Sequence, residues 1–320
     1  MRIHNITFVQ RKRKLKLGTF LMIIIIALLV IVLGFVAYLS YVGWSLVHPG
    51  RESFTVSSAT APAGYKNVSF TDSTGSIPLK GWYFASPGSK KTIILCHGYR
   101  ENRLQFKPEM IKEFIKAGYN VLTFDFRNCG KSGGSTTSVG YYEKYDLLGA
   151  INFIKKNYSS KISVMGWSMG AATSITAAAE DKAVCAVIAD SPFADLNDYL
   201  NAQLPVWSHI PPKWSHLPQA PFNKVILLAT RILTGMNPSQ VSPRNSISKI
   251  APRPLLLIHS EDDNAISIKN SVELYSIYEK AAGSKAEFWN ADGAGHVGTY
   301  GRSPDIYMSK VIDFLNRAYR

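Results

Sequence analysis

The sequence has few cysteines, few acidic residues and a single long hydrophobic run. Three cysteines in 320 residues exclude a disulfide-stapled scaffold, and an odd number excludes complete internal pairing. Their spacing does not fit a metal site. A single apolar run excludes a transporter with many membrane spans, and a hydrophobic share of 46% excludes a disordered tail. The chain can therefore hold one large folded domain or two small ones.

Acidic residues are scarcest at the N-terminus. Residues 1–16 contain six basic side chains and no acidic one: Arg2, Arg11, Lys12, Arg13, Lys14 and Lys16. They account for part of the net charge of +14, and the remaining residues have 30 basic against 22 acidic side chains. A basic run by itself suggests nucleic-acid binding. Its place beside an apolar stretch favours membrane topology instead, so we expect no nucleic-acid partner.

The apolar stretch is uncharged from Leu17 to Val47, and its most apolar part is Phe20–Leu39. It exceeds the roughly 20 residues with which a helix crosses a bilayer. A buried core helix would be shorter and would have a polar face. A cleaved secretory signal would have an apolar region of about 7–15 residues. We therefore expect residues 17–47 to form a transmembrane anchor.

The flanks of this anchor predict its orientation. Basic residues precede it, so the positive-inside rule keeps residues 1–16 in the cytoplasm and places the rest of the chain outside. Tyr38, Tyr41 and Trp44 lie where an outer aromatic belt is expected. The prediction is a single-pass protein of the cell membrane with an extracytoplasmic domain.

Short apolar runs alternate with helical patterns through residues 65–320, after a linker at 48–64 that is rich in small residues. The expected strands are Lys66–Thr71, Leu79–Ala85, Thr92–His97, Tyr119–Phe124, Ile162–Trp167, Val184–Ala189, Leu255–His259 and Ala286–Asn290. The expected helices are Leu104–Lys116, Tyr142–Lys156, Met169–Ala179, Ile268–Lys280 and Pro304–Ala318. This alternation predicts an α/β fold with a mostly parallel central sheet flanked by helices.

One segment, at about 197–252, interrupts the alternation. It has no clear strand but several aromatic residues and prolines: Trp207, Trp214, Phe222, Pro205, Pro211, Pro212, Pro218 and Pro221. An irregular loop of this length is rare in a compact domain unless it is functional. We expect a helical cap insertion over one end of the sheet, and an ordinary crossover with extra surface helices is the alternative.

The sequence Gly166-Trp167-Ser168-Met169-Gly170 matches G-x-S-x-G. The match by itself is weak, but it lies between an expected strand and an expected helix, where a nucleophile elbow is found. So tight a turn leaves no room for a Cβ atom at Gly166 or Gly170. Ser168 is therefore the candidate nucleophile, and the helix N-terminus beside it favours developing negative charge.

A serine hydroxyl needs a base, and in the order Ser, Asp, His that base follows the acid. Of the seven histidines, only His296 lies beyond Asp262 and Asp263, in a glycine-rich loop. The alternative for His296 is a surface histidine without function. Asp263 and Asp262 both follow a strand, at the sheet edge where ligands collect in α/β folds. Asp190 also ends a strand and is a less favoured candidate for the acid.

An oxyanion hole needs two backbone N–H donors. We expect one from Met169, which follows the nucleophile, and one from Tyr99, which follows the strand Thr92–His97. His97 is expected to have a structural role. A nucleotide-binding P-loop ending at Gly130-Lys131-Ser132 is excluded because Asp125 stands where its first glycine is required.

Residues from about Tyr65 to Arg320 resemble the α/β-hydrolase superfamily, and more narrowly the membrane-anchored bacterial serine hydrolases of the serine aminopeptidase and carboxylesterase type. The resemblance rests on five segments: Cys96-His97-Gly98-Tyr99, Asp125 to Gly133, Gly166 to Gly170, Ile258 to Asp263 and Gly293 to His296. The chain has Ser260 and Ser267 where the family pattern has glycine and proline, but the register still favours Asp263 as the acid.

The resemblance implies hydrolysis through an acyl-enzyme, without a metal or an organic cofactor. We expect ester hydrolysis with a small-molecule or lipid ester as substrate, and Ser168, His296 and Asp263 as the triad. A peptidase or amidase of the same fold is the first alternative, because it would use the same triad. A non-catalytic surface-binding protein is the second. The positive charge outside the membrane suggests contact with anionic cell-wall polymers or lipid headgroups.

Overall fold

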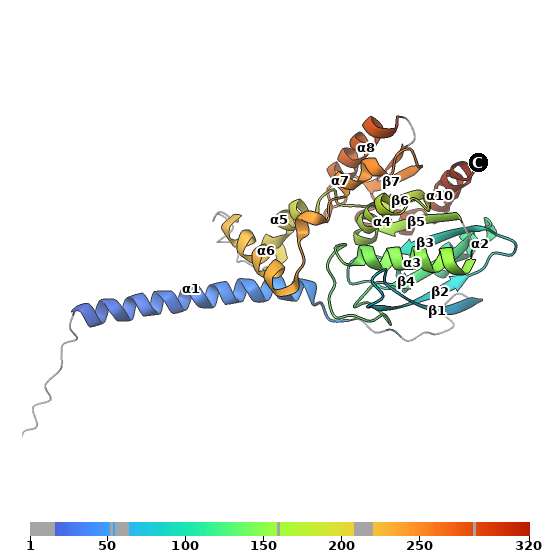
Figure 1. Cartoon of the computed structure of the whole chain (residues 1–320). Coiled ribbons are helices and arrows are strands. Elements are labelled where there is room, and N and C mark those ends of the chain that lie inside the picture. Colours follow the sequence, from blue (N-terminus) through green and yellow to red (C-terminus); the bar gives the residue numbers. More distant parts are fainter. Residues whose placement is uncertain (1–16, 52–53, 55–63, 159–160, 208–219, 284–285) are drawn as a thin grey trace, which may run out of the picture.

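The computed structural model describes residues 17–51, 54, 64–158, 161–207, 220–283 and 286–320 (Figure 1). The expected cytoplasmic segment 1–16 and most of the linker 48–64 lie outside these residues. So do Trp214 and three prolines of the expected insertion, Pro211, Pro212 and Pro218.

Eight strands form one mixed sheet in the order β1-β2-β4-β3-β5-β6-β7-β8. Their bounds are β1 Tyr65–Thr71, β2 Pro78–Phe84, β3 Lys91–Cys96, β4 Asn120–Asp125, β5 Lys161–Trp167, β6 Val184–Asp190, β7 Leu255–Ser260 and β8 Ala286–Ala291. β2 pairs antiparallel with β1 and with β4, and all other neighbours are parallel. Every expected strand occurs, displaced by at most one residue at either end. The predicted α/β class is confirmed.

Helices cover both faces of the sheet (Figure 1). Their bounds are α2 Pro108–Lys116, α3 Glu143–Tyr158, α4 Met169–Glu180, α8 Lys269–Ala282 and α10 Pro304–Ala318. Successive strand residues point to opposite faces, so Val164 of β5 joins the core under α3, α4 and α8, and Met165 joins the core under α2 and α10. The result is a three-layer domain with the sheet fully covered in its middle.

The start of α2 differs from the expected helix Leu104–Lys116. Residues Arg103–Gln105 form a separate 3-10 turn, and α2 begins at Pro108. A proline disfavours helical backbone in the residue before it but fits the first helical position. Lys107 is accordingly extended, with φ −65° and ψ 150°.

The segment between β6 and β7 is helical and contains no strand among its described residues. It consists of α5 Leu196–Trp207, α6 Ala220–Thr234, α7 Pro243–Ser246 and the 3-10 turns Pro238–Gln240 and Ile247–Lys249. α5 and α6 stand apart from the sheet, and α6 lies beside the end of the long N-terminal helix (Figure 1). We call these two helices the cap.

The N-terminal helix α1 spans Leu17–Val47 and is long and apolar enough to cross a membrane, a test that signal sequences also pass. Its first two-thirds expose apolar side chains, whereas Leu39, Val42 and Val47 are buried. At Gly43 the helix lies so close to α6 that a Cβ atom would overlap Thr230 Oγ1. The end of α1 is therefore packed into the folded domain, against the cap.

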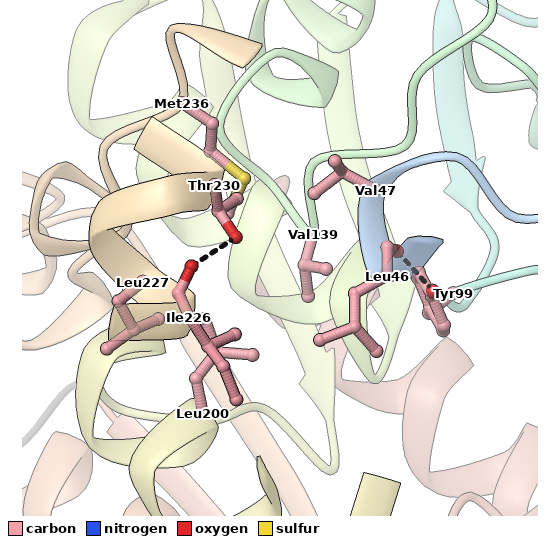
Figure 2. Close-up of a pocket in the computed structure, with 9 residues that line it drawn as sticks. All are labelled: Leu46, Val47, Tyr99, Val139, Leu200, Ile226, Leu227, Thr230 and Met236. Carbon is pink, nitrogen blue, oxygen red and sulfur yellow. Dashed lines mark hydrogen bonds between the residues drawn. The ribbon is translucent and has the colours of Figure 1, made fainter. Parts of the chain in front are cut away.

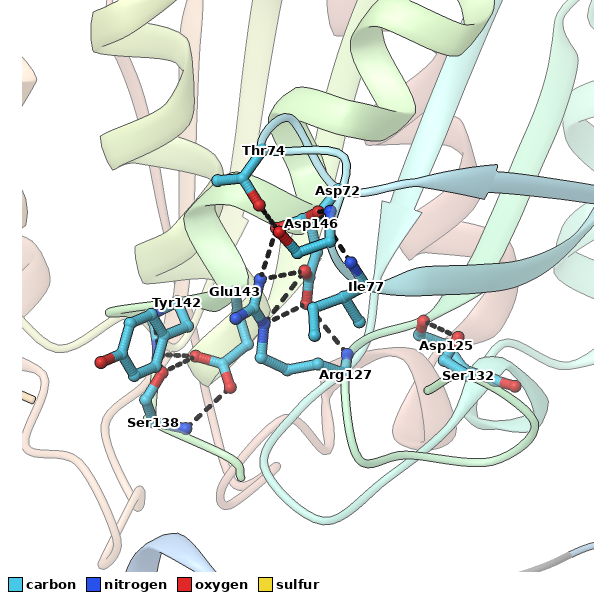
Figure 3. A network of polar contacts seen from close by, with 12 residues as sticks. Asp72, Thr74, Ile77, Asp125, Arg127, Ser132, Ser138, Tyr142, Glu143 and Asp146 are labelled. Carbon is cyan, nitrogen blue, oxygen red and sulfur yellow. Dashed lines mark hydrogen bonds and ion pairs between the residues drawn. The ribbon is translucent and has the colours of Figure 1, made fainter. Parts of the chain in front are cut away.

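A buried polar network supports the loop on which the end of α1 rests (Figure 3). The guanidinium of Arg127, just after β4, lies 2.6 Å from an oxygen of Asp146 and 3.2 Å from one of Asp72. Further along the loop, the Thr137 N–H donates to the carbonyl of Val47 at 2.8 Å. The ion pairs thus tie α3 and the β1–β2 turn to the loop that receives α1.

Candidate active site

Ser168 lies in the tight turn between β5 and α4. Its backbone has φ 55° and ψ −117°, a strained conformation for a residue with a side chain. A Cβ atom on Gly166 would overlap the carbonyl of Gly170, and one on Gly170 would overlap the carbonyl of Cys96 in β3. The two glycines are therefore required sterically, as the sequence argument expected.

Three side chains from different loops meet at the carboxyl end of the sheet. His296, in the loop after β8, places Nε2 2.9 Å from Ser168 Oγ. Its Nδ1 lies 2.7 Å from Oδ2 of Asp263, which follows β7. The imidazole is 30% exposed, whereas the Asp263 side chain is fully buried. This is the order of contacts that a Ser-His-Asp triad requires.

The environment of Asp263 stabilises its charged form. Oδ1 accepts hydrogen bonds from the N–H groups of Ala265 and Ile266, at 2.9 and 2.8 Å. Burial by itself would raise the pKa of Asp263. The hydrogen bonds from His259, His296 and Ile266 N–H outweigh it and hold the pKa below its usual value. The carboxylate facing His296 is therefore ionised at neutral pH.

The two other candidate acids do not contact His296. Asp262 is exposed in the loop after β7. Asp190 is buried at the end of β6, where it accepts hydrogen bonds from Tyr307 Oη at 2.8 Å and Ser191 Oγ at 3.1 Å. Burial raises the pKa of Asp190 to about 6. Asp190 belongs to a structural network behind Ser168.

The loop after β3 passes directly over Ser168. A Cβ atom built on Gly98 would lie 3.7 Å from the Ser168 Cβ. His97 fixes this loop, because its Nε2 accepts from the Phe126 N–H at 3.0 Å and its Nδ1 donates to the Gly98 carbonyl at 2.8 Å. Burial lowers the pKa of His97 to about 4, so the ring is neutral. His97 thus has the structural role that was expected.

The two predicted oxyanion donors follow directly after Gly98 and Ser168, the two residues that approach each other here. Tyr99 follows Gly98, and Met169 follows Ser168 at the first position of α4. Met169 is thus adjacent to Ser168 in the chain, and Tyr99 follows the glycine that approaches it. The roles of their N–H groups stay predictions.

An open cleft lies beside His296. Its walls include the polar side chains of Glu101, Asn102 and Lys107 and the aromatic rings of Trp167 and Tyr300. A polar leaving group could reach the exposed edge of the imidazole from this side.

A second, narrow pocket lies between the end of α1 and the cap, with Tyr99 in its wall (Figure 2). Its apolar walls come from three parts of the chain: Leu46 and Val47 of α1, Tyr99 and Val139 of two loops, and Leu200, Leu227 and Met236 of the cap region. The hydroxyl of Tyr99 donates to the Leu46 carbonyl at 2.6 Å, and that of Thr230 donates to the Ile226 carbonyl at 2.8 Å. The hydroxyls in the lining are thus satisfied, and the pocket favours an apolar occupant.

Among the described residues, no cluster of three or more His, Cys, Asp or Glu side chains is arranged to hold a metal ion. Cys96 is buried in β3, and burial raises the pKa of its thiol to about 12. Cys129 is also buried, and Cys185 is partly buried. All three are free thiols, and Cys96 is an inert core residue.

One residue of the site was not anticipated. His259, near the end of β7, places Nε2 3.2 Å from Oδ2 of Asp263, and both side chains are fully buried. The same nitrogen lies 2.8 Å from the Ile266 carbonyl, and Nδ1 lies 2.7 Å from Ser271 Oγ. The one available signal in the sequence was a histidine at the end of an apolar strand, four residues before the acid.

Known proteins share the fold and part of the sequence. A family model described as serine aminopeptidase, S33, matches residues 87–227, which include Ser168 but end before Asp263 and His296. The uncharacterized protein YqkD of Bacillus subtilis is 36% identical over 242 residues, 74% of this chain and 75% of that protein. The solved Pyrococcus furiosus esterase Pf2001 is 32% identical with a TM-score of 0.64, over 84% of this chain and 98% of the esterase. The crystal structure of the hydrolase GrgF from Penicillium has a TM-score of 0.61 over 79% of this chain and 98% of GrgF, and at 20% identity this shows the fold alone.

Proposed function

Since the chain belongs to the α/β-hydrolase superfamily, we propose that it is a membrane-tethered serine hydrolase that cleaves carboxylic esters through an acyl-enzyme. The observation that carries the proposal is the continuous set of contacts from Ser168 Oγ through the two nitrogens of His296 to Asp263 Oδ2. The strained backbone of Ser168 supports it, because such strain is typical of a nucleophile elbow.

In the proposed reaction, Ser168 Oγ attacks the ester carbonyl and His296 Nε2 takes its proton. Asp263 holds the imidazole in place and stabilises the imidazolium. The N–H groups of Tyr99 and Met169 bind the oxyanion. His296 then gives the proton to the leaving alcohol, and the C–O bond breaks to leave the acyl group on Ser168. A water molecule, deprotonated by His296, releases the acid in the second half-reaction.

The two cavities support an ester with unlike ends. The open cleft beside His296 contains charged and polar side chains, which suit a polar alcohol. The narrow pocket beyond Tyr99 is apolar and has a free volume of about 20 Å³, which suits the small apolar end of an acyl group and not a long chain. The identity of Pf2001 as an esterase also supports an ester substrate.

The membrane part of the proposal is carried by α1. The helix is long enough to span a bilayer, and six basic residues precede it. A cleaved signal sequence passes the same test. However, Leu39, Val42 and Val47 of α1 are buried in the folded domain, which supports a helix that stays attached.

The proposal is tested by labelling the full-length chain in detergent with a fluorophosphonate probe. Wild type should be labelled, and Ser168→Ala should lose the label completely. Ser309→Ala, which alters an exposed serine of α10, should be labelled like wild type. Undiminished labelling of Ser168→Ala would exclude Ser168 as the nucleophile.

Hydrolysis of aminoacyl groups is a second candidate. It is favoured by the aminopeptidase description of the matched family. Assays with p-nitrophenyl esters and with aminoacyl p-nitroanilides distinguish the two. A kcat/KM at least tenfold higher for the anilides would replace the ester proposal.

A further inference from the structure

The cap helix α6 exposes a group of large apolar side chains. Leu228, Ile232 and Leu233 are 58%, 73% and 55% exposed. Outside α1, the described residues include only two other large hydrophobic side chains with this degree of exposure, Val272 on α8 and Ile306 on α10. Among the side chains that the structure describes outside α1, three of the five most exposed large apolar ones therefore lie on α6.

The same face of α6 is basic. Lys224 and Arg231 are exposed, and the spacing 224, 228, 231 and 232 places them with the apolar residues on one side of the helix. The opposite side, with Ile226 and Thr230, is buried against α1. A helix with long basic side chains among exposed leucine and isoleucine is typical of a membrane surface, because Lys and Arg extend to the headgroups while the apolar side chains enter the hydrocarbon.

The contacts with α1 give the position of α6 relative to a bilayer. The rings of Phe222 and Phe35 are 5.6 Å apart, and Ile226 and Thr230 lie against Gly43. α6 therefore packs along the outer part of α1, with its start beside Phe35 and its middle beside Gly43 (Figure 1). Phe35 lies one turn, about 6 Å, inside the end of the most apolar stretch at Leu39.

From Phe222 onward, α6 runs toward the folded domain and away from the hydrocarbon. Its exposed residues Leu228, Arg231 and Ile232 lie near the part of α1 around Gly43. This part of α1 also presents the exposed rings of Tyr41 and Trp44. Aromatic rings of this kind mark the membrane–water interface. The apolar face of α6 thus continues the apolar surface of α1 at the level where the hydrocarbon meets the headgroups.

We propose that α6 lies in the outer leaflet of the bilayer, with Leu228 and Ile232 in the hydrocarbon boundary and Lys224 and Arg231 on anionic phospholipid headgroups. This rests on the proposed membrane anchor, because α1 supplies the depth. The inner side of α6 contributes Leu227 and Thr230 to the apolar pocket that Tyr99 also lines, so the helix proposed to face the membrane forms one wall of that pocket.

The test uses spin labels on the full-length chain in vesicles of phosphatidylcholine and phosphatidylglycerol at 4:1. Cys185→Ser removes the one partly exposed thiol, and single cysteines are introduced as Leu228→Cys and Ile232→Cys. Val272→Cys is the matched control, because Val272 is 50% exposed on α8, far from α1 (Figure 1). Ile25→Cys on α1 reports the bilayer itself. The measured quantity is the ratio of oxygen accessibility to nickel-chelate accessibility.

The ratio at 228 and 232 should be at least twofold higher than at 272 and closer to that at 25. Adding Lys224→Glu and Arg231→Glu should lower it, because the two new charges repel anionic headgroups. Equal ratios at 228, 232 and 272, with a high ratio at 25, would overturn the proposal by placing α6 in water. A low ratio at 25 as well would reject the anchor and the α6 proposal together. Fluorophosphonate labelling of the same samples reports the hydrolase function independently of both.

Discussion

His259 and His296 hold the same oxygen of Asp263 between two imidazole rings. Oδ2 lies 3.2 Å from Nε2 of His259 and 2.7 Å from Nδ1 of His296. Only His296 reaches Ser168. His259 is instead fixed by Ser271 Oγ and the Ile266 carbonyl, so it acts on the site through the position of Asp263.

His259→Phe is expected to lower the rate of Ser168 labelling by about tenfold. The variant removes a hydrogen bond to the buried carboxylate of Asp263 and leaves the Ser271 hydroxyl without a partner. Leaving a buried polar group unpaired costs about 1–3 kcal/mol of free energy. His259→Gln, which keeps one donor, should recover part of the rate. The measurement is the second-order labelling rate, with the melting temperature recorded for each variant. A lower melting temperature with an unchanged labelling rate would show that His259 serves stability alone.

Asp263→Asn should reduce kcat by about 10⁴-fold, because an asparagine does not stabilise the imidazolium of His296. The matched change Asp262→Asn alters the neighbouring carboxyl, which is exposed, and should leave kcat within about twofold. Steady-state hydrolysis of p-nitrophenyl butyrate by the two variants makes the comparison. A large loss in Asp262→Asn and a small one in Asp263→Asn would reverse the assignment of the acid.

Asp190 makes the stability of the fold depend on pH. Burial raises its pKa from 3.8 to about 6, so the folded chain holds this proton more tightly than the unfolded chain does. The protonated Asp190 therefore stabilises the folded state below about pH 4, and this stabilisation is lost as the pH rises to about 6. The corresponding change in the free energy of unfolding is roughly 3 kcal/mol.

Asp190→Asn removes this titration. The melting temperature of the variant relative to wild type should therefore rise between pH 4 and pH 7, because wild type alone must ionise a buried carboxyl. The melting curves are recorded by tryptophan fluorescence in one detergent. A constant difference across this interval would mean that the Asp190 carboxyl does not titrate there.

The apolar pocket predicts a dependence on acyl chain length. The pocket is too small for a long chain, so Leu227→Ala, which enlarges it, should raise kcat/KM for p-nitrophenyl decanoate by about tenfold with little change for the acetate. Val272→Ala, a comparable truncation on exposed α8, should change neither value. An unchanged ratio of decanoate to acetate activity in Leu227→Ala would show that the pocket does not hold the acyl chain.

The sheet and the elbow were predictable because they depend on local patterns. β4 is buried at every position, and its apolar run identified it. Gly166 and Gly170 identified the turn at Ser168, since a side chain at either position would collide with neighbouring backbone. The order of acid and base along the chain was enough to select His296.

The contacts that depend on loop geometry were not predictable. Asp262 and Asp263 both follow β7, and only the turn stabilised by the Ala265 and Ile266 N–H groups decides which carboxylate is buried toward His296. The role of His259 depends on the same turn, which brings the carbonyl of Ile266 back to the imidazole. The close approach of α1 to α6 requires the small residue Gly43, because a Cβ atom there would overlap Thr230. A single glycine in an apolar helix gives no sequence signal for such a contact.

The hydrogen bond from the Tyr99 hydroxyl to the Leu46 carbonyl has a consequence for any shortened form of the protein. A chain cut at residue 48 would lose Leu46 and Val47, which close one side of the pocket, and it would leave the Tyr99 hydroxyl without this acceptor. Ile226 and Thr230 of α6 would become exposed at the same time. A water-soluble fragment would thus expose apolar surface of the cap that the intact chain covers, would tend to aggregate, and would have this pocket open on one side.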